Sequence, residues 1–102
     1  MEIKTGKSVI DIEIKALGLL KNSISKSFRD AVLTLHQTKG KIVLSGIGKS
    51  GHIAKKISST LSSIGSPSFF IHPAEANHGD LGMISKNESV VLISNSGETI
   101  EL

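Results

Sequence analysis

The chain has 102 residues, enough for one small domain, and its 38% hydrophobic content permits a packed core. It has no cysteine, which excludes disulfides, thiolate metal sites and thiol catalysis and fits a cytoplasmic location. The sequence also has neither the apolar core of a signal peptide nor an apolar run long enough to span a membrane. The net charge is +3, but only three residues are aromatic and the lysines are scattered, so the composition disfavours nucleic-acid binding.

The stretch from Ser8 to Thr38 is predicted to be helical, because its apolar residues recur at steps of three and four. Gly18 and the polar stretch Lys21 to Ser23 interrupt the pattern, so we expect two helices or one bent helix. The apolar stripe packs either on the protein's own core or on a second subunit, and we therefore expect residues 1–40 to form a helical segment on or between subunits. Its members are Ile10, Ile14, Leu17, Ile24, Phe28, Val32 and Leu35.

Three short hydrophobic runs follow, and each is predicted to be a strand. They are Lys41 to Ser45, Ser68 to Ile71 and Ser89 to Ser94. A helical pattern with Ile53, Ile57, Leu61 and Ile64 separates the first two, a polar loop with a helical turn at Glu75 to His78 precedes the third, and another helix begins at the end.

This alternation predicts an α/β fold, a parallel sheet flanked by helices in an αβα sandwich of the flavodoxin-like kind. The third run is continuously hydrophobic, which predicts that both of its faces are covered. Because three strands are few for such a sheet, we expect residues 41–102 to be the first, incomplete part of the domain.

The stretch Ser45 to His52, "SGIGKSGH", joins the first strand to the helix that follows it. A nucleoside-triphosphate loop would need glycine at position 43, which is Val43, so that interpretation fails. The spacing Gly-x-Gly-x-x-Gly also fits a dinucleotide-binding turn. That turn expects an acidic residue at the end of the second strand, where this chain has His72 and Pro73, with Glu75 slightly late. A dinucleotide-binding oxidoreductase fragment is therefore an open but weaker alternative.

The third strand runs into "SNSGET", which offers the hydroxyls of Ser94, Ser96 and Thr99 beside the start of a predicted helix. Free amides at a helix N-terminus bind anions, so this pattern predicts a phosphate site. Ordinary helix capping explains one of the hydroxyls but not three. The carboxyl ends of parallel strands share one edge, where Lys49 and His72 would also lie. Lys49 stands at the positive end of a helix, an unfavourable place for a cation that suggests a role in function.

Several other polar side chains belong to these loops. His52 is interpreted as a helix-face residue, and Glu75 and Asp80 as residues that structure the loop after the second strand. These features together predict a site for a small phosphorylated metabolite, with phosphate at one end and titratable groups at the other.

The segments "GIGKSGH", "HPAEANHGDLGM" and "SNSGET" resemble the SIS (sugar isomerase) domain of the arabinose-5-phosphate isomerase family over residues 41–102. The resemblance implies the interconversion of D-ribulose 5-phosphate and D-arabinose 5-phosphate through an enediolate. It further implies a supply of arabinose 5-phosphate for synthesis of the lipopolysaccharide sugar 3-deoxy-D-manno-octulosonate (Kdo). A non-catalytic phosphosugar-binding module of the same fold is the alternative.

The resemblance also implies roles for individual residues. Catalysis would involve Lys49, Glu101 and His78. The substrate would contact Ser50, Gly65, Ser66, His72, His78, Ser94, Ser96 and Thr99. His72 could also take an inhibitory zinc ion, and no cofactor is required. Family members are homo-oligomers, expected here as a dimer or tetramer, and continue beyond the segment matched here, often into CBS modules.

Overall fold

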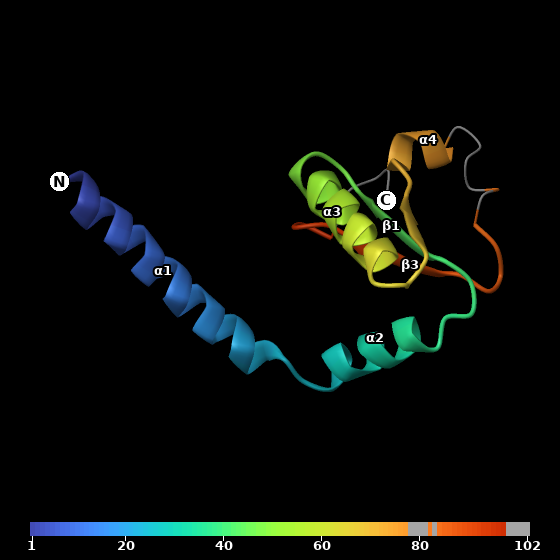
Figure 1. The fold of residues 1–102 in the computed structure, drawn as a ribbon, viewed down its shortest axis with the longest axis horizontal. Coiled ribbons are helices and arrows are strands. Elements are labelled where there is room, and N and C mark those ends of the chain that lie inside the picture. Colours follow the sequence, from blue (N-terminus) through green and yellow to red (C-terminus); the bar gives the residue numbers. More distant parts are fainter. Residues whose placement is uncertain (78–81, 83, 98–102) are drawn as a thin grey trace. The chain divides into compact units, whose positions relative to one another are not determined.

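The computed structural model describes residues 1–77, 82 and 84–97, which fall into two compact units, Met1–Leu33 and Thr34–Leu102. The N-terminal unit holds helix α1 (Glu2–Ser23) and most of helix α2 (Lys26–His36) (Figure 1). The chain is extended at Ile24, with φ −71° and ψ 117°, which confirms the predicted interruption. Helix α1 starts at Glu2 rather than at Ser8, since an acidic residue in the first turn stabilises the helix dipole. No residue of α1 is buried in this chain.

The second unit contains a parallel three-stranded sheet with the order β2-β1-β3. The strands are β1 (Ile42–Gly46), β2 (Ser68–Phe70) and β3 (Ser89–Ile93). Val43 pairs with Phe69 on one side and with Val90 on the other. Helix α3 (Lys49–Ser63) connects β1 to β2, and the short helix α4 (Pro73–Asn77) follows β2. Proline suits the first position of a helix, where the missing N–H is no loss.

The core lies between the sheet and α3, which lies alongside strand β1 in Figure 1. Ile42 and Leu44 of β1 contact Ala54 of α3, and all three are buried. Partly buried side chains from neighbouring elements surround them: Leu35, Leu61, Phe70, Val91 and Ile93. The central strand β1 pairs with a strand on each side and is buried along its whole length.

Strand β3 differs from the sequence-based expectation that both of its faces are covered. Val91 and Ile93 pack toward the core, whereas Val90 is 45% exposed and Leu92 is 52% exposed. Burial along the strand therefore alternates in this chain. The physical reason is that α3 packs on one face of the sheet and leaves the alternate side chains of this edge strand on the other.

Two glycines allow the end of β1 and the start of α3 to touch. A Cβ on Gly51 would lie 2.6 Å from the carbonyl oxygen of Gly46, and a Cβ on Gly46 would lie 2.9 Å from the carbonyl carbon of Ser50. Real Cβ atoms do not approach backbone so closely, so glycine is needed at both positions. Close packing of helix on strand thus accounts for two of the three glycines in the "GIGKSG" turn.

Candidate functional site

The first element of the candidate site is the turn between β1 and α3. Gly48 has φ 63°, a conformation that favours glycine, and α3 begins at the next residue, Lys49. The turn places Lys49 at the carboxyl edge of the central strand with its side chain exposed, while Ser50 is half-buried beside it. The expected position of Lys49 at this edge is therefore confirmed.

His72 reaches the same edge from the next strand, because it lies between β2 and α4. Its Nδ1 accepts a hydrogen bond from the backbone N–H of Ala74 at 3.1 Å. An accepting Nδ1 carries no proton, so in the neutral ring Nε2 carries the proton and can donate to a ligand. The ring is half-buried and held by this bond, which orients it relative to the end of the sheet.

A cavity of about 270 Å³ lies between α3 and the end of β2. Its lining brings together His72, the ring of Phe70, and His52 and Lys55 from the first two turns of α3. Glycines 46, 48 and 51 complete the lining, so part of the wall is bare backbone. The sequence patterns identify His52 only as a helix-face residue and do not single out Lys55. The signal that could have found them is the step of three residues from Lys49 to His52 and again from His52 to Lys55. Such steps place the three side chains on one side of a helix.

The loop after β3 forms the other flank of this edge. The backbone N–H of Gly97 donates to Ser94 Oγ at 2.9 Å, and Gly97 has φ 72°. Ser94 therefore acts as the kind of local cap that is the alternative to phosphate binding, while Ser96 is exposed. Three predicted site residues, Thr99, His78 and Glu101, lie outside the described residues.

Gly65 and Ser66 are not brought together with Lys49 and His72. They precede β2 at the opposite end of α3, and a helix of 15 residues is about 22 Å long. Gly65 has φ 94°, and the N–H of Ser66 donates to the carbonyl oxygen of Leu61 at 2.8 Å, an arrangement that ends many helices at glycine. Helix termination thus gives Gly65 a structural role at this end of the fold.

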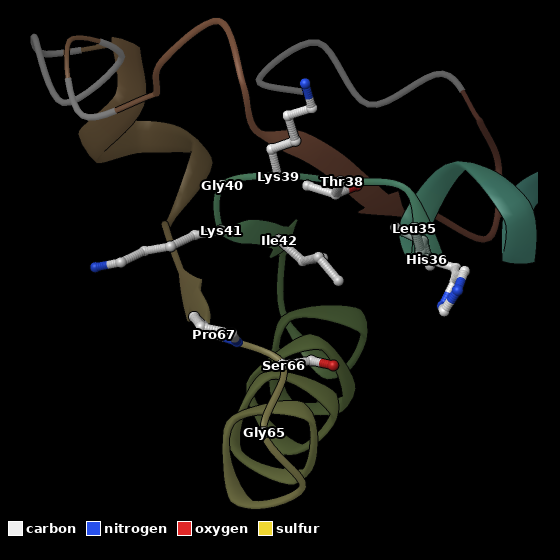
Figure 2. A pocket seen from close by; sticks show the side chains of 10 residues that line it. All are labelled: Leu35, His36, Thr38, Lys39, Gly40, Lys41, Ile42, Gly65, Ser66 and Pro67. Carbon is white, nitrogen blue, oxygen red and sulfur yellow. The ribbon is translucent and has the colours of Figure 1, made fainter.

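A second cavity, of about 370 Å³, lies beside this turn at the amino end of the strands. Figure 2 shows Ile42, Ser66 and Pro67 around it, while the side chains of Lys39 and Lys41 extend away from Ser66. The two ammonium groups therefore do not converge on a common point. The wall nearest β1 is formed by the aliphatic side chain of Ile42 and by backbone.

Metal-binding and membrane-spanning features are absent over the described ranges. No three His, Asp or Glu side chains there gather closely enough to hold a metal ion. Zinc at His72 therefore stays a prediction that rests on one described ligand. In the same part of the chain, no helix combines the length and apolar character needed to cross a membrane.

Known proteins of similar sequence add to this geometry. The chain is 54% identical over 96 residues to an uncharacterized protein of Rickettsia prowazekii (strain Madrid E), covering 94% of this chain and 30% of that protein. It is 48% identical over 99 residues to the arabinose 5-phosphate isomerase KdsD of Escherichia coli (strain K12), covering 97% of this chain and 30% of the enzyme. The chain thus spans about 30% of the length of these curated relatives.

Solved structures share the fold as well as the sequence. One, an Escherichia coli CFT073 protein in complex with arabinose 5-phosphate, superposes with a TM-score of 0.88 at 46% identity, covering 97% of this chain and 53% of that chain. A phosphosugar isomerase structure from Bacteroides fragilis, described as involved in capsule formation, gives a TM-score of 0.81 at 41% identity and covers 95% and 53%. The SIS domain model matches residues 34–102. With its parallel strands flanked by helices and its glycine turn at their carboxyl edge, this chain belongs to the SIS domain family.

Proposed function

We propose that this chain forms the first part of an aldose–ketose isomerase that interconverts D-ribulose 5-phosphate and D-arabinose 5-phosphate. The observation that carries the proposal is 48% identity to arabinose 5-phosphate isomerases over almost the whole chain. The arrangement of Lys49 and His72 at one edge of the sheet supports it, because a lysine and an imidazole donor can both stabilise an oxyanion. In the proposed pathway the product feeds the synthesis of Kdo for lipopolysaccharide.

The chemistry needs a base and a stabiliser of negative charge. A base removes a proton from C1 of the ketose, and the carbonyl electrons move onto O2 to give an enediolate. Return of a proton to C2, with transfer of the O1 proton, completes the aldose, so no electrons leave the sugar. We assign stabilisation of the enediolate to the ammonium of Lys49 and donation to a sugar oxygen to Nε2 of His72. Glu101 and His78 are proposed as the proton-transfer groups.

The proposed phosphate position is the loop after β3, with Ser94, Ser96 and Thr99. A phosphate there would lie across the central strand from His72, because β3 and β2 flank β1 on opposite sides. The carbon chain would then pass over the glycine turn, beside Lys49. A dinucleotide is not proposed, because His72 and Pro73 occupy the end of β2, where such a ligand needs a carboxylate.

The direct test is an isomerase assay on the protein expressed from its full gene. Lys49→Ala should lower kcat by about a hundred-fold or more, since one preorganised donor to an oxyanion contributes about that much. Lys56→Ala, an exposed lysine on the same helix, serves as the matched control and should retain activity. Exchange of the sugar's C–H proton with deuterated water, followed by NMR, reports the enediolate. Phosphosugar binding without any exchange would support the non-catalytic binding module instead.

We further propose that the protein is a homo-oligomer, a dimer or tetramer, in which helix α1 packs against a second copy. The support is that α1 has no buried residue in one chain and that its apolar side chains are largely exposed, Leu17 by 63%. Gly65 and Ser66 lie too far from Lys49 to serve the same pocket in one chain, so contact with substrate would require a site shared between copies. The cytoplasmic location remains a prediction.

Subunit mixing tests this arrangement. Lys49→Ala and Ser66→Trp would each reduce activity, and a shared site predicts that mixed oligomers of the two variants recover part of it. No recovery from mixed oligomers, with each variant still assembling by analytical ultracentrifugation, would place both positions outside a shared site.

A further inference from the structure

The cavity between α3 and the end of β2 contains two basic side chains that the proposed mechanism does not use. They are His52 and Lys55, which lie three residues apart on α3 and therefore on one side of the helix. His72 faces the same cavity from the end of β2. Among the described residues that line it, none is Asp or Glu, so the polar side chains of the lining are two imidazoles and an ammonium.

The ammonium of Lys55 lies over an aromatic ring. Its Nζ lies 5.1 Å from the centroid of Phe70, within the range of a cation–π contact. Phe70 is partly buried and packs against the core, which fixes the position of its ring. The Lys55 side chain is exposed, and its ammonium lies at the wall of the cavity. The contact leaves the N–H groups of the ammonium available to a ligand.

The other walls suit the same kind of ligand. His72 accepts from the Ala74 N–H through Nδ1, so Nε2 is the atom that can donate. The glycine part of the lining has no side chains to keep a ligand away from the backbone. A volume of about 270 Å³ lies just below the range of about 300 to 1,000 Å³ that holds drug-sized ligands. It therefore fits a small charged group with a few attached carbons.

We infer that this cavity is a phosphate-binding subsite in which Lys55 supplies the positive charge and His52 a further hydrogen-bond donor. It is separate from the loop after β3, since the two lie on opposite flanks of the central strand β1. Lys55 contributes a charge-assisted hydrogen bond, and His52 adds a second donor from the same side of the helix. The subsite does not depend on turnover, so it can be tested whether or not the protein is an isomerase.

The first experiment is a calorimetric titration of the full-length protein with inorganic phosphate at constant ionic strength. Lys55→Met keeps the aliphatic stem and removes the charge. We expect it to weaken binding by up to about ten-fold, the size of one charge-assisted hydrogen bond at an exposed site. Lys56→Met is the matched control, because it removes the same charge from the next residue of α3 and should change affinity by less than about two-fold. Lys55→Arg should retain binding, and His52→Gln should weaken it.

The outcomes separate the subsite from general electrostatics. Equal weakening by Lys55→Met and Lys56→Met would mean that only net charge matters, and would overturn the inference. A Lys55→Met protein that keeps the same number of phosphate sites with the same affinities as the parent would show that Lys55 binds no phosphate, and would overturn it as well. Circular dichroism and thermal unfolding of each variant verify that the fold is intact before its affinity is compared.

Kinetics then identify the source of the phosphate. If the subsite, rather than the loop after β3, holds the ester of the sugar substrate, inorganic phosphate inhibits competitively and Lys55→Met raises KM about ten-fold with kcat largely retained. If it holds a separate anion, phosphate inhibits without competing, and Lys55→Met abolishes the inhibition while KM is unchanged. Both results support the subsite. Absence of isomerase activity would refute the proposed function alone, since the titration still decides whether the subsite exists.

Discussion

Replacing Gly51 by alanine should destabilise the protein, even though alanine is the better helix former. A Cβ at this position would lie 2.6 Å from the carbonyl oxygen of Gly46 and 3.2 Å from its carbonyl carbon. Both atoms belong to the backbone of β1, which pairs with a strand on each side. The obstacle therefore cannot rotate away as a side chain would, and α3 must move off the sheet.

The size of the effect follows from two opposing contributions. Helix propensity favours alanine over glycine by about 1 kcal/mol. Overpacking of a tight interior costs about 1 to 3 kcal/mol, and more when backbone must shift. With a contact as short as this one, we expect a net loss of about 2 kcal/mol in the free energy of unfolding, or roughly thirty-fold in the equilibrium constant. Because α3 begins two residues earlier, the shift should also displace Lys49 and lower kcat/KM.

Gly18→Ala provides the control, since Gly18 is also helical but its Cβ would meet nothing within 4 Å. We expect that variant to be more stable than the parent protein by up to about 1 kcal/mol. Urea unfolding of the full-length variants measures both changes. A Gly51→Ala protein as stable as the parent, or more stable, would refute the packing argument and the close approach of α3 to β1 on which it rests.

Three further predictions concern the core and the site. Ser45→Ala should lower the free energy of unfolding by about 1 to 2 kcal/mol in urea, because it removes the buried hydrogen bond that Ser45 Oγ donates to the Ile71 carbonyl at 2.5 Å; an unchanged midpoint would contradict this. Leu44→Ala should cost about 2 to 5 kcal/mol, since Leu44 is 1% exposed, whereas Leu44→Met conserves volume and should cost less than about 1.5 kcal/mol; equal losses would rule out a packing origin. In isomerase assays, zinc should inhibit the parent protein more strongly than His72→Gln, and identical inhibition curves would remove His72 as the zinc ligand.

The fold class and most element positions could be predicted from the sequence, because periodicity reports directly on local structure. The strands predicted at Lys41 to Ser45 and Ser89 to Ser94 each agree with the structure to within one residue at either end. The interruption near Lys21 to Ser23 and the helix end at Gly65 were also expected. The start of α1 was missed, since the residues before Ser8 show no apolar stripe, whereas Glu2 in the first turn stabilises the helix there.

The candidate site was only partly predictable. The rule that parallel strands end at one edge correctly placed Lys49 and His72 at the same edge of the sheet. It said nothing of Gly65 and Ser66, whose assignment came from resemblance and whose position is at the far end of α3. Lys55 was missed, because a lysine on a polar helix face looks solvated until a ring from another strand is known to lie beneath it.

By itself, the sequence determined the order of helices and strands, the glycine turn after the first strand and membership of a phosphosugar-binding class, because local periodicity and short motifs are properties of contiguous residues. The tertiary structure alone decided that Phe70 lies under Lys55, that His52 and His72 share a cavity, and that Val90 and Leu92 stay exposed while their neighbours are buried. Each of these depends on which surfaces meet when the sheet and α3 pack. The packing of the sheet on α3 depends on contacts between residues far apart in the chain, and these contacts cannot be predicted from a local sequence pattern.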